Sequence, residues 1–148
     1  MSQASAGAPP KGRKAPSRPY VRPLSPHLQI WRWHVTMLGS ILSRFTGIGL
    51  YVGLILVGVW LAALAAGPAT YEIFHTYAAR PLALVVWIGL TLCAFYHLAA
   101  GVRHLVWDMG VGLKPATADL LSTLSIWFAL LATVAFWGWL FLDGRVQL

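Results

Sequence analysis

One histidine, His97, lies inside a long apolar stretch, and its neighbours at helical spacing are small. The residues that share its helix face three and four positions away are Cys93, Ala94, Ala100 and Gly101. An imidazole inside a bilayer is costly unless it has a partner. A neutral imidazole binds haem iron through one ring nitrogen and needs clearance for the flat macrocycle. His97 is therefore a candidate haem ligand; the alternative is a histidine hydrogen-bonded to a neighbouring helix, with small residues that serve only packing.

A second candidate pair is Ser40 and Arg44, which are four residues apart and share one face of a helix. A hydroxyl and a guanidinium at the same depth can hold a polar group that enters from lipid, such as a quinone carbonyl. Alternatively, Arg44 extends to lipid phosphates at the membrane boundary.

Other chemistry finds little support in the sequence. The single cysteine excludes an intrachain disulfide framework and any cysteine-based metal site within this chain. No serine, cysteine or carboxylate constellation for hydrolysis occurs, and no phosphate-binding loop is present. We expect no catalytic residue in this chain by itself.

The composition indicates an integral membrane protein. Of the 148 residues, 58% are hydrophobic and only 10% are charged, against about 25% in a soluble domain. Three apolar stretches are each long enough to cross a hydrocarbon core of about 30 Å as a helix. The sequence predicts an all-α fold with three transmembrane helices over about residues 41–66, 81–106 and 118–142. The short alternating segments of a membrane β-barrel are missing.

The basic residues are placed as membrane topology requires, so the net charge of +7 does not indicate binding to nucleic acid. Nine of the 11 basic residues precede the uncharged run of the first span or lie between the uncharged runs of the second and third spans, and the other two lie on the opposite side. This bias predicts a cytoplasmic N-terminus. The nine are Lys11, Arg13, Lys14, Arg18, Arg22, Arg32, Arg44, Arg103 and Lys114, and the two are Arg80 and Arg145.

Two segments precede the spans. Residues 1–21 are rich in Pro, Ala, Ser and Gly and contain no acid, which predicts a disordered basic tail in front of a membrane-anchor domain over residues 22–148. A cleaved mitochondrial presequence is the alternative; the tail is short for one, so we expect the bacterial inner (cytoplasmic) membrane in preference to the mitochondrial inner membrane. Residues 24–38 mix tryptophan, histidine and arginine with aliphatic side chains, which predicts an N-terminal interfacial segment.

Three blocks together resemble the cytochrome b556 membrane-anchor subunits of succinate dehydrogenase (respiratory complex II). They are Arg22–Leu28 (RPLSPHL), Ser40–Gly47 (SILSRFTG) and His97–Gly110 (HLAAGVRHLVWDMG). The resemblance covers roughly residues 20–145. One position departs from the pattern, because Ser43 stands where the family usually has histidine.

The resemblance implies a four-subunit enzyme that passes electrons from succinate to ubiquinone. A flavoprotein subunit with FAD and an iron–sulfur subunit with its clusters would join two membrane anchors that share a haem b. His97 matches the axial ligand of the haem iron, and the other ligand would come from the second anchor. Ser40 and Arg44 match the quinone-binding residues, while Arg44, Arg103 and His104 match positions near the haem propionates.

Two other functions remain open on the sequence. One is a haem-bearing membrane subunit of another quinone-linked oxidoreductase, although such subunits often carry two haem histidines in one chain. The other is a cofactor-free membrane scaffold, which would explain the spans but not the intramembrane imidazole.

Overall fold

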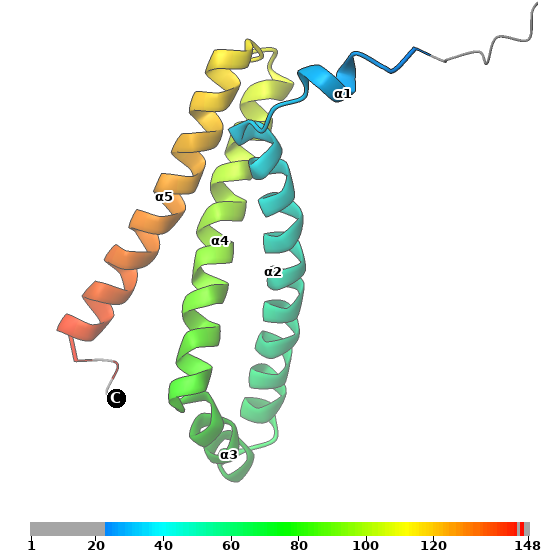
Figure 1. Cartoon of the computed structure of the whole chain (residues 1–148). Helices are drawn as coiled ribbons and strands as arrows, with labels where there is room; N and C mark the ends of the chain where they lie inside the picture. Colours follow the sequence, from blue (N-terminus) through cyan, green and yellow to red (C-terminus); the bar gives the residue numbers. More distant parts are fainter. Residues whose placement is uncertain (1–22, 145, 147–148) are drawn as a thin grey trace, which may run out of the picture. The chain divides into compact units, whose positions relative to one another are not determined.

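The computed structural model describes residues 23–144 and 146. This part of the chain contains helices and no strand, which confirms the predicted all-α fold (Figure 1). The predicted basic tail, residues 1–21, lies outside the described residues. The helices are α1 (His27–Ile30), α2 (Val35–Ala65), α3 (Pro68–Ala78), α4 (Pro81–Asp108) and α5 (Pro115–Leu142).

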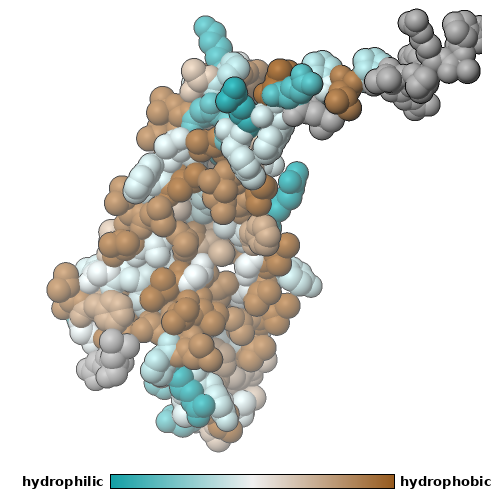
Figure 2. Space-filling view, viewed as in Figure 1, coloured by the Kyte–Doolittle hydropathy of each residue, from teal (hydrophilic) through white to brown (hydrophobic). Residues whose placement is uncertain are grey.

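Helices α2, α4 and α5 are each long and apolar enough to cross a membrane, as the sequence predicts. Hydrophobic side chains cover the middle of this bundle, and hydrophilic ones gather at its ends (Figure 2). Helix α2 begins at Val35, several residues before the start expected at about residue 41. Helix α4 ends at Asp108, two residues past the expected end, so both helices extend beyond their most apolar windows.

The interfacial segment, residues 24–38, is helical in two pieces, α1 and the first turn of α2, and residues 31–34 between them are not helical. Helix α1 is a single turn that follows Pro26 and ends where Trp31 adopts an extended conformation. Trp31 and Trp33 are both exposed. Exposed indole rings in front of a spanning helix are typical of a segment at the level of the lipid headgroups.

The connection between the first two spans contains a short helix, α3. Gly67 has a φ of 108°, a conformation that favours glycine, and it reverses the chain directly after α2. Pro68 then occupies the first turn of α3, where the missing N–H costs no helical hydrogen bond. Because α3 contains Glu72 and His75 and is short, its sequence lacks the apolar run by which the spans are recognised.

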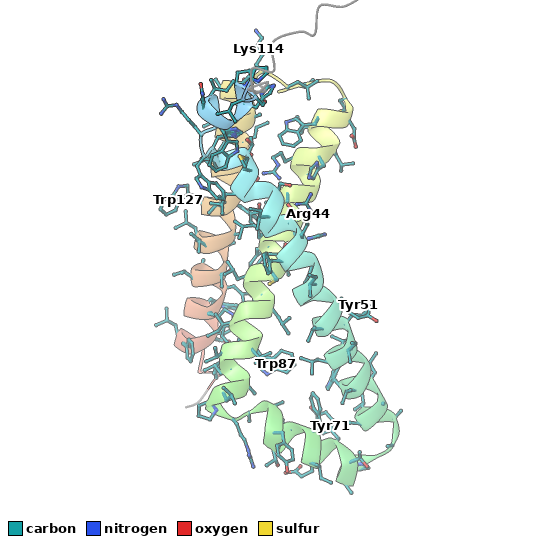
Figure 3. The ribbon with its side chains drawn as sticks, turned by 45° about the vertical axis from the view of Figure 1, so that its right-hand side comes forward. Arg44, Tyr51, Tyr71, Trp87, Lys114 and Trp127 are labelled. Carbon is teal, nitrogen blue, oxygen red and sulfur yellow. The ribbon has the colours of Figure 1, made fainter. Side chains whose placement is uncertain are left out.

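The three long helices form one bundle in which α4 packs against both α2 and α5, and α2 also contacts α5. The antiparallel order of α2 and α4 places Arg44, Arg103 and Lys114 towards one end of the bundle and Arg80 at the other. Figure 3 shows Lys114 at the end opposite to Tyr71 of α3.

Glycines allow α2 and α4 to approach each other closely. A Cβ atom at Gly49 would lie 2.9 Å from Cys93 Sγ, and one at Gly53 would lie 3.1 Å from Leu90 Cδ2. Both distances are shorter than ordinary van der Waals contacts, so these two glycines, four residues apart, allow close helix packing.

Replacing Gly49 tests this packing. Gly49→Ala should destabilise the protein by about 1–3 kcal/mol, because the new methyl overlaps Cys93 Sγ. Adding Cys93→Ala should recover most of the loss. Gly58→Ala is the matched control on α2, since a Cβ there meets nothing within 4 Å. Thermal unfolding in detergent measures all three, and equal stabilities of the Gly49 and Gly58 variants would contradict the close approach.

Candidate functional site

His97 lies on an exposed side of α4, and its ring contacts α2. Its Nδ1 atom is 3.4 Å from the Oγ1 atom of Thr46. A Cβ atom at Gly47 would be 3.5 Å from His97 Cε1, so the ring lies in contact distance of the α2 backbone. The imidazole is thus held at one edge by α2 while the rest of it faces the bundle surface.

The four small residues around His97 have different surroundings. Ala100 is buried in the core beside Tyr96, and Cys93 packs on Gly49. Ala94 is exposed, and a Cβ atom at Gly101 would meet nothing within 4 Å. Two of these small residues, Cys93 and Ala100, therefore serve packing inside this chain. The other two, Ala94 and Gly101, leave open space beside the imidazole.

Ser40 and Arg44 both lie exposed on α2, one helical turn apart. Arg44 and Tyr51 project from the same side of α2 in Figure 3. Thr46, which contacts His97, follows Arg44 by two residues, or about 3 Å along the helix axis. The structure therefore brings the predicted quinone pair and the predicted haem ligand to neighbouring levels along the bundle.

The hydroxyl of Ser40 differs from the other hydroxyls of the spans. Seven serine and threonine hydroxyls donate to the carbonyl oxygen four residues earlier in their own helix. The hydroxyl of Ser40 makes no hydrogen bond with any described residue. This hydroxyl is available to a molecule outside this chain. The seven belong to Ser43, Thr46, Thr91, Ser122, Thr123, Ser125 and Thr133.

Arg103 points into the bundle, unlike His97. Its side chain is only 4% exposed, and Nη1 donates to Ser122 Oγ at 3.1 Å. The guanidinium also lies over the Trp107 ring, 4.9 Å from its centroid. Its Nε atom has no hydrogen-bond partner among the described residues, and none of their carboxylates forms an ion pair with it. A buried cation of this kind is stabilised only in part by this chain.

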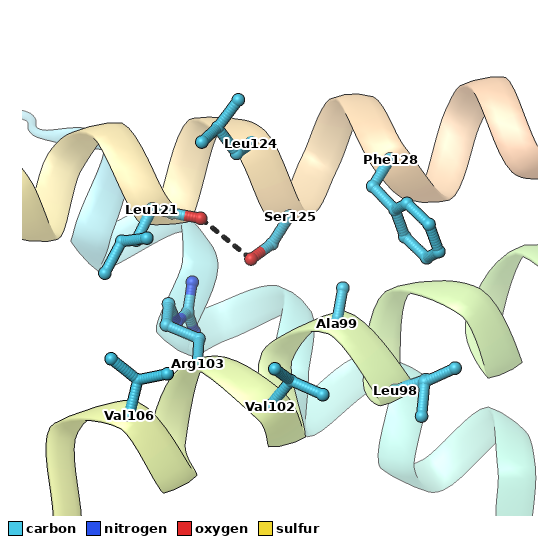
Figure 4. A pocket seen from close by; sticks show the side chains of 9 residues that line it. All are labelled: Leu98, Ala99, Val102, Arg103, Val106, Leu121, Leu124, Ser125 and Phe128. Atoms are coloured by element: carbon cyan, nitrogen blue, oxygen red, sulfur yellow. Dashed lines mark hydrogen bonds between the residues drawn. The ribbon is translucent and has the colours of Figure 1, made fainter. Parts of the chain in front are cut away.

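Arg103 lines a groove between α4 and α5 with a volume of about 410 Å³ (Figure 4). The other lining side chains are aliphatic or aromatic except Ser125, whose hydroxyl donates to Leu121 O. Neither His97 nor His104 lines this groove. Arg103 and His97 therefore face different surroundings although they are close in sequence.

His104 is exposed on α4, and its ring meets the Trp107 ring edge-on with 5.2 Å between the centroids. It follows His97 by seven residues, so it lies about 10 Å farther along the axis. At that separation the two histidines cannot bind the same metal ion. Among the described residues no group of three or more His, Cys, Asp or Glu side chains could hold a metal ion.

Ser43, which stands in the family's usual histidine position, turns towards its own helix. Its hydroxyl donates to Gly39 O at 2.9 Å, and the Tyr96 hydroxyl donates to the same carbonyl at 2.8 Å. Gly39 also provides room for Arg103, because a Cβ there would lie 3.0 Å from Nη1. Ser43 therefore lies in the closely packed region around Gly39 at this end of the bundle.

Sequence reasoning missed the contribution of Thr46, although this threonine lies in one of the three blocks. It also missed Tyr96 and Ser122, which bind Gly39 O and Arg103 across the bundle. The sequence offered one signal for them: Tyr96 is a polar residue adjacent to His97, and Thr46 and Ser122 are polar residues within a span. Their partners lie on other helices, so spacing along the chain could not identify them.

The arrangement offers the imidazole of His97 within a span, and a hydroxyl and a guanidinium that are exposed on α2. One imidazole supplies one ligand to a haem iron, and the open space at Gly101 leaves clearance for a flat group. The residues present therefore fit half of a haem site.

Comparisons with known proteins point to one family. Residues 18–136 match the family of succinate dehydrogenase/fumarate reductase transmembrane subunits. The succinate dehydrogenase cytochrome b556 subunit of Paracoccus denitrificans is 38% identical over 93 residues, which are 63% of this chain and 72% of the relative. That of Rickettsia felis is 31% identical over 116 residues (78% and 90%). The mitochondrial cytochrome b560 subunit of Sus scrofa is 41% identical over 98 residues (62% and 56%).

The buried contact of Arg103 can be tested with two serines of α5. Ser122→Ala should destabilise the protein by about 1–3 kcal/mol, because it leaves a buried guanidinium N–H without an acceptor. Ser125→Ala is the matched control, since this hydroxyl is also buried and donates to its own helix but does not contact Arg103. Thermal unfolding in detergent compares the two, and equal losses would contradict a special role of Ser122.

Proposed function

The chain belongs to the family of succinate dehydrogenase/fumarate reductase transmembrane subunits, and we propose that it carries one axial ligand of a haem b and part of a ubiquinone-reduction site. It is a membrane-anchor subunit of succinate dehydrogenase, so the enzyme activity belongs to a complex. Relatives named cytochrome b556 and b560 support a haem b in this one. A cofactor-free scaffold and a subunit of another oxidoreductase are no longer needed as explanations.

The position of His97 is the observation that carries the proposal. Its imidazole lies in an apolar span, is exposed at the bundle surface and is held at one edge by α2. An imidazole facing lipid would be costly, whereas one facing a haem in a neighbouring subunit is satisfied by the iron. When bound, haem b accepts and donates single electrons. We assign the second axial ligand to the partner anchor, because no other histidine among the described residues lies at that depth.

Three residues lie near the haem propionates in the proposal. Arg44, Arg103 and His104 lie towards the same end of the bundle, and all three sequence positions match the family's propionate neighbourhood. Arg44 and His104 are exposed, while Arg103 is buried without a carboxylate partner among the described residues. An anionic group close to this end would offset the cost of the buried guanidinium.

Ser40 and Arg44 form this chain's part of the quinone site. The free hydroxyl of Ser40 can donate to a quinone oxygen, and the Arg44 guanidinium can stabilise the negative charge that develops as the quinone is reduced. Ser40 and Arg44 lie about one helical turn from the contact of His97 with α2. A quinone bound to them would therefore be close to the proposed haem.

The remaining partners follow from the complex. We assign a second membrane anchor to the surface that bears His97, and an iron–sulfur subunit and a flavoprotein with FAD to the cytoplasmic end. The excess of basic residues at the end of Arg44 and Lys114 supports a cytoplasmic N-terminus in a bacterial inner membrane. Electrons from succinate would then enter at the end where Ser40 and Arg44 lie.

Replacing His97 tests the haem assignment. In the purified complex, His97→Ala should convert the low-spin haem spectrum towards high spin or cause loss of haem, because one axial ligand is removed. His75→Ala on α3 is the control, since this exposed histidine lies at the other end of the bundle. Optical and electron paramagnetic resonance spectra report the result. An unaltered low-spin spectrum at full haem occupancy would exclude coordination by His97.

Replacing Arg44 tests the quinone assignment. Arg44→Leu should lower succinate–quinone turnover much more than succinate oxidation with an artificial acceptor that takes electrons before the membrane domain. Ser40→Ala should act in the same direction but less strongly, by about 0.5–1.5 kcal/mol for one lost hydrogen bond.

The matched control is Arg80→Leu. Arg80 also lies exposed at a membrane boundary, but at the opposite end, over the Tyr77 ring. Its loss should leave the ratio of the two activities unchanged. Equal decreases in both assays for Arg44→Leu would show failed assembly instead of a quinone-site defect.

A further inference from the structure

The hydroxyl of Thr46 is a buried group with three polar neighbours. The residue is 8% exposed. Its Oγ1 atom lies 2.8 Å from Leu42 O, 3.2 Å from Ser43 O and 3.4 Å from His97 Nδ1. A hydroxyl has one proton to donate and two lone pairs that accept. The direction of the contact with His97 therefore depends on where that one proton goes.

The distances place the proton of Thr46 on its own helix. The contact with Leu42 O is 0.6 Å shorter than the contact with His97 (3.4 Å against 2.8 Å). Both carbonyl oxygens are acceptors only, so each of them requires the hydroxyl as a donor. Only the lone pairs of Oγ1 remain available to His97, and a lone pair can only accept a hydrogen bond.

It follows that the histidine must be the donor, with its proton on Nδ1. If Nδ1 carried the lone pair, two acceptors would face each other at 3.4 Å in a region without water. In the neutral ring the lone pair is then on Nε2, which is the nitrogen remote from Thr46. The Gly47 backbone beneath Cε1 limits rotation of the ring further.

We propose that Thr46 is the positioning residue of His97: it accepts the Nδ1 proton and thereby aims the Nε2 lone pair away from α2 at the iron. This inference rests on the proposed role of His97 as an axial ligand. Histidines that bind metals commonly donate their second N–H to an oxygen, which fixes the tautomer and makes the ring a stronger electron donor. A stronger donor favours the oxidised iron, so Thr46 should lower the midpoint potential of the haem.

The test compares threonine variants in the complete complex by potentiometric titration of the haem. Thr46→Val keeps the shape but removes the acceptor, and the midpoint potential should rise. Thr46→Ser keeps the hydroxyl and should restore the wild-type potential. Thr133→Val is the matched control, because Thr133 is equally buried and donates to its own helix at Ala129 O without contacting a histidine. A Thr46→Val potential equal to that of Thr133→Val, at full haem occupancy, would overturn the proposal.

A second measurement applies if the Thr46→Val complex does not assemble. In the reduced wild-type complex labelled with ¹⁵N-histidine, nuclear magnetic resonance should find His97 protonated at Nδ1 and bound to iron at Nε2. Iron on Nδ1, or an Nδ1 without a proton, would overturn the role of Thr46. The two proposals fail differently: if His97→Ala leaves the haem spectrum unchanged, the ligand assignment is wrong. If His97→Ala disrupts the spectrum but Thr46→Val leaves the potential unchanged, only the role of Thr46 is wrong.

Discussion

The need to satisfy polar groups without water determines the structure of this bundle. In the hydrocarbon region every backbone and side-chain donor has to find its acceptor inside the protein. The hydroxyls of α2, α4 and α5 mostly do so by donating to a carbonyl of their own helix. The polar groups that break this pattern are therefore informative, and Ser40 and Arg44 on α2 and His97 on α4 are exposed examples.

The sequence predicted the three spanning helices because each is an apolar run of the length that a bilayer requires. It did not predict α3, since a short helix with polar residues such as Glu72 has no such run, and its existence depends on the chain reversal at Gly67 and on Pro68. Helix α2 likewise starts before its apolar window, because backbone hydrogen bonds continue wherever no residue interrupts them.

The candidate site was predictable in its residue types but only partly in its geometry. An intramembrane histidine and a serine–arginine pair were visible in the sequence, and helical spacing placed Ser40 and Arg44 on one face. The contact between Thr46 and His97 joins residues from two helices, which no local pattern encodes. Arg103 lies six residues after His97, which is about 120° away around the helix, and this explains why it points into the bundle.

The central claim is that the exposed face of α2 and α4 is one half of a haem site. The most direct measurement is a structure of the intact complex by cryo-electron microscopy. It should show the haem iron bonded to Nε2 of His97, with Thr46 on the opposite ring nitrogen and a histidine of the partner anchor as the second ligand. A haem held entirely by other chains, with His97 facing lipid, would contradict the account.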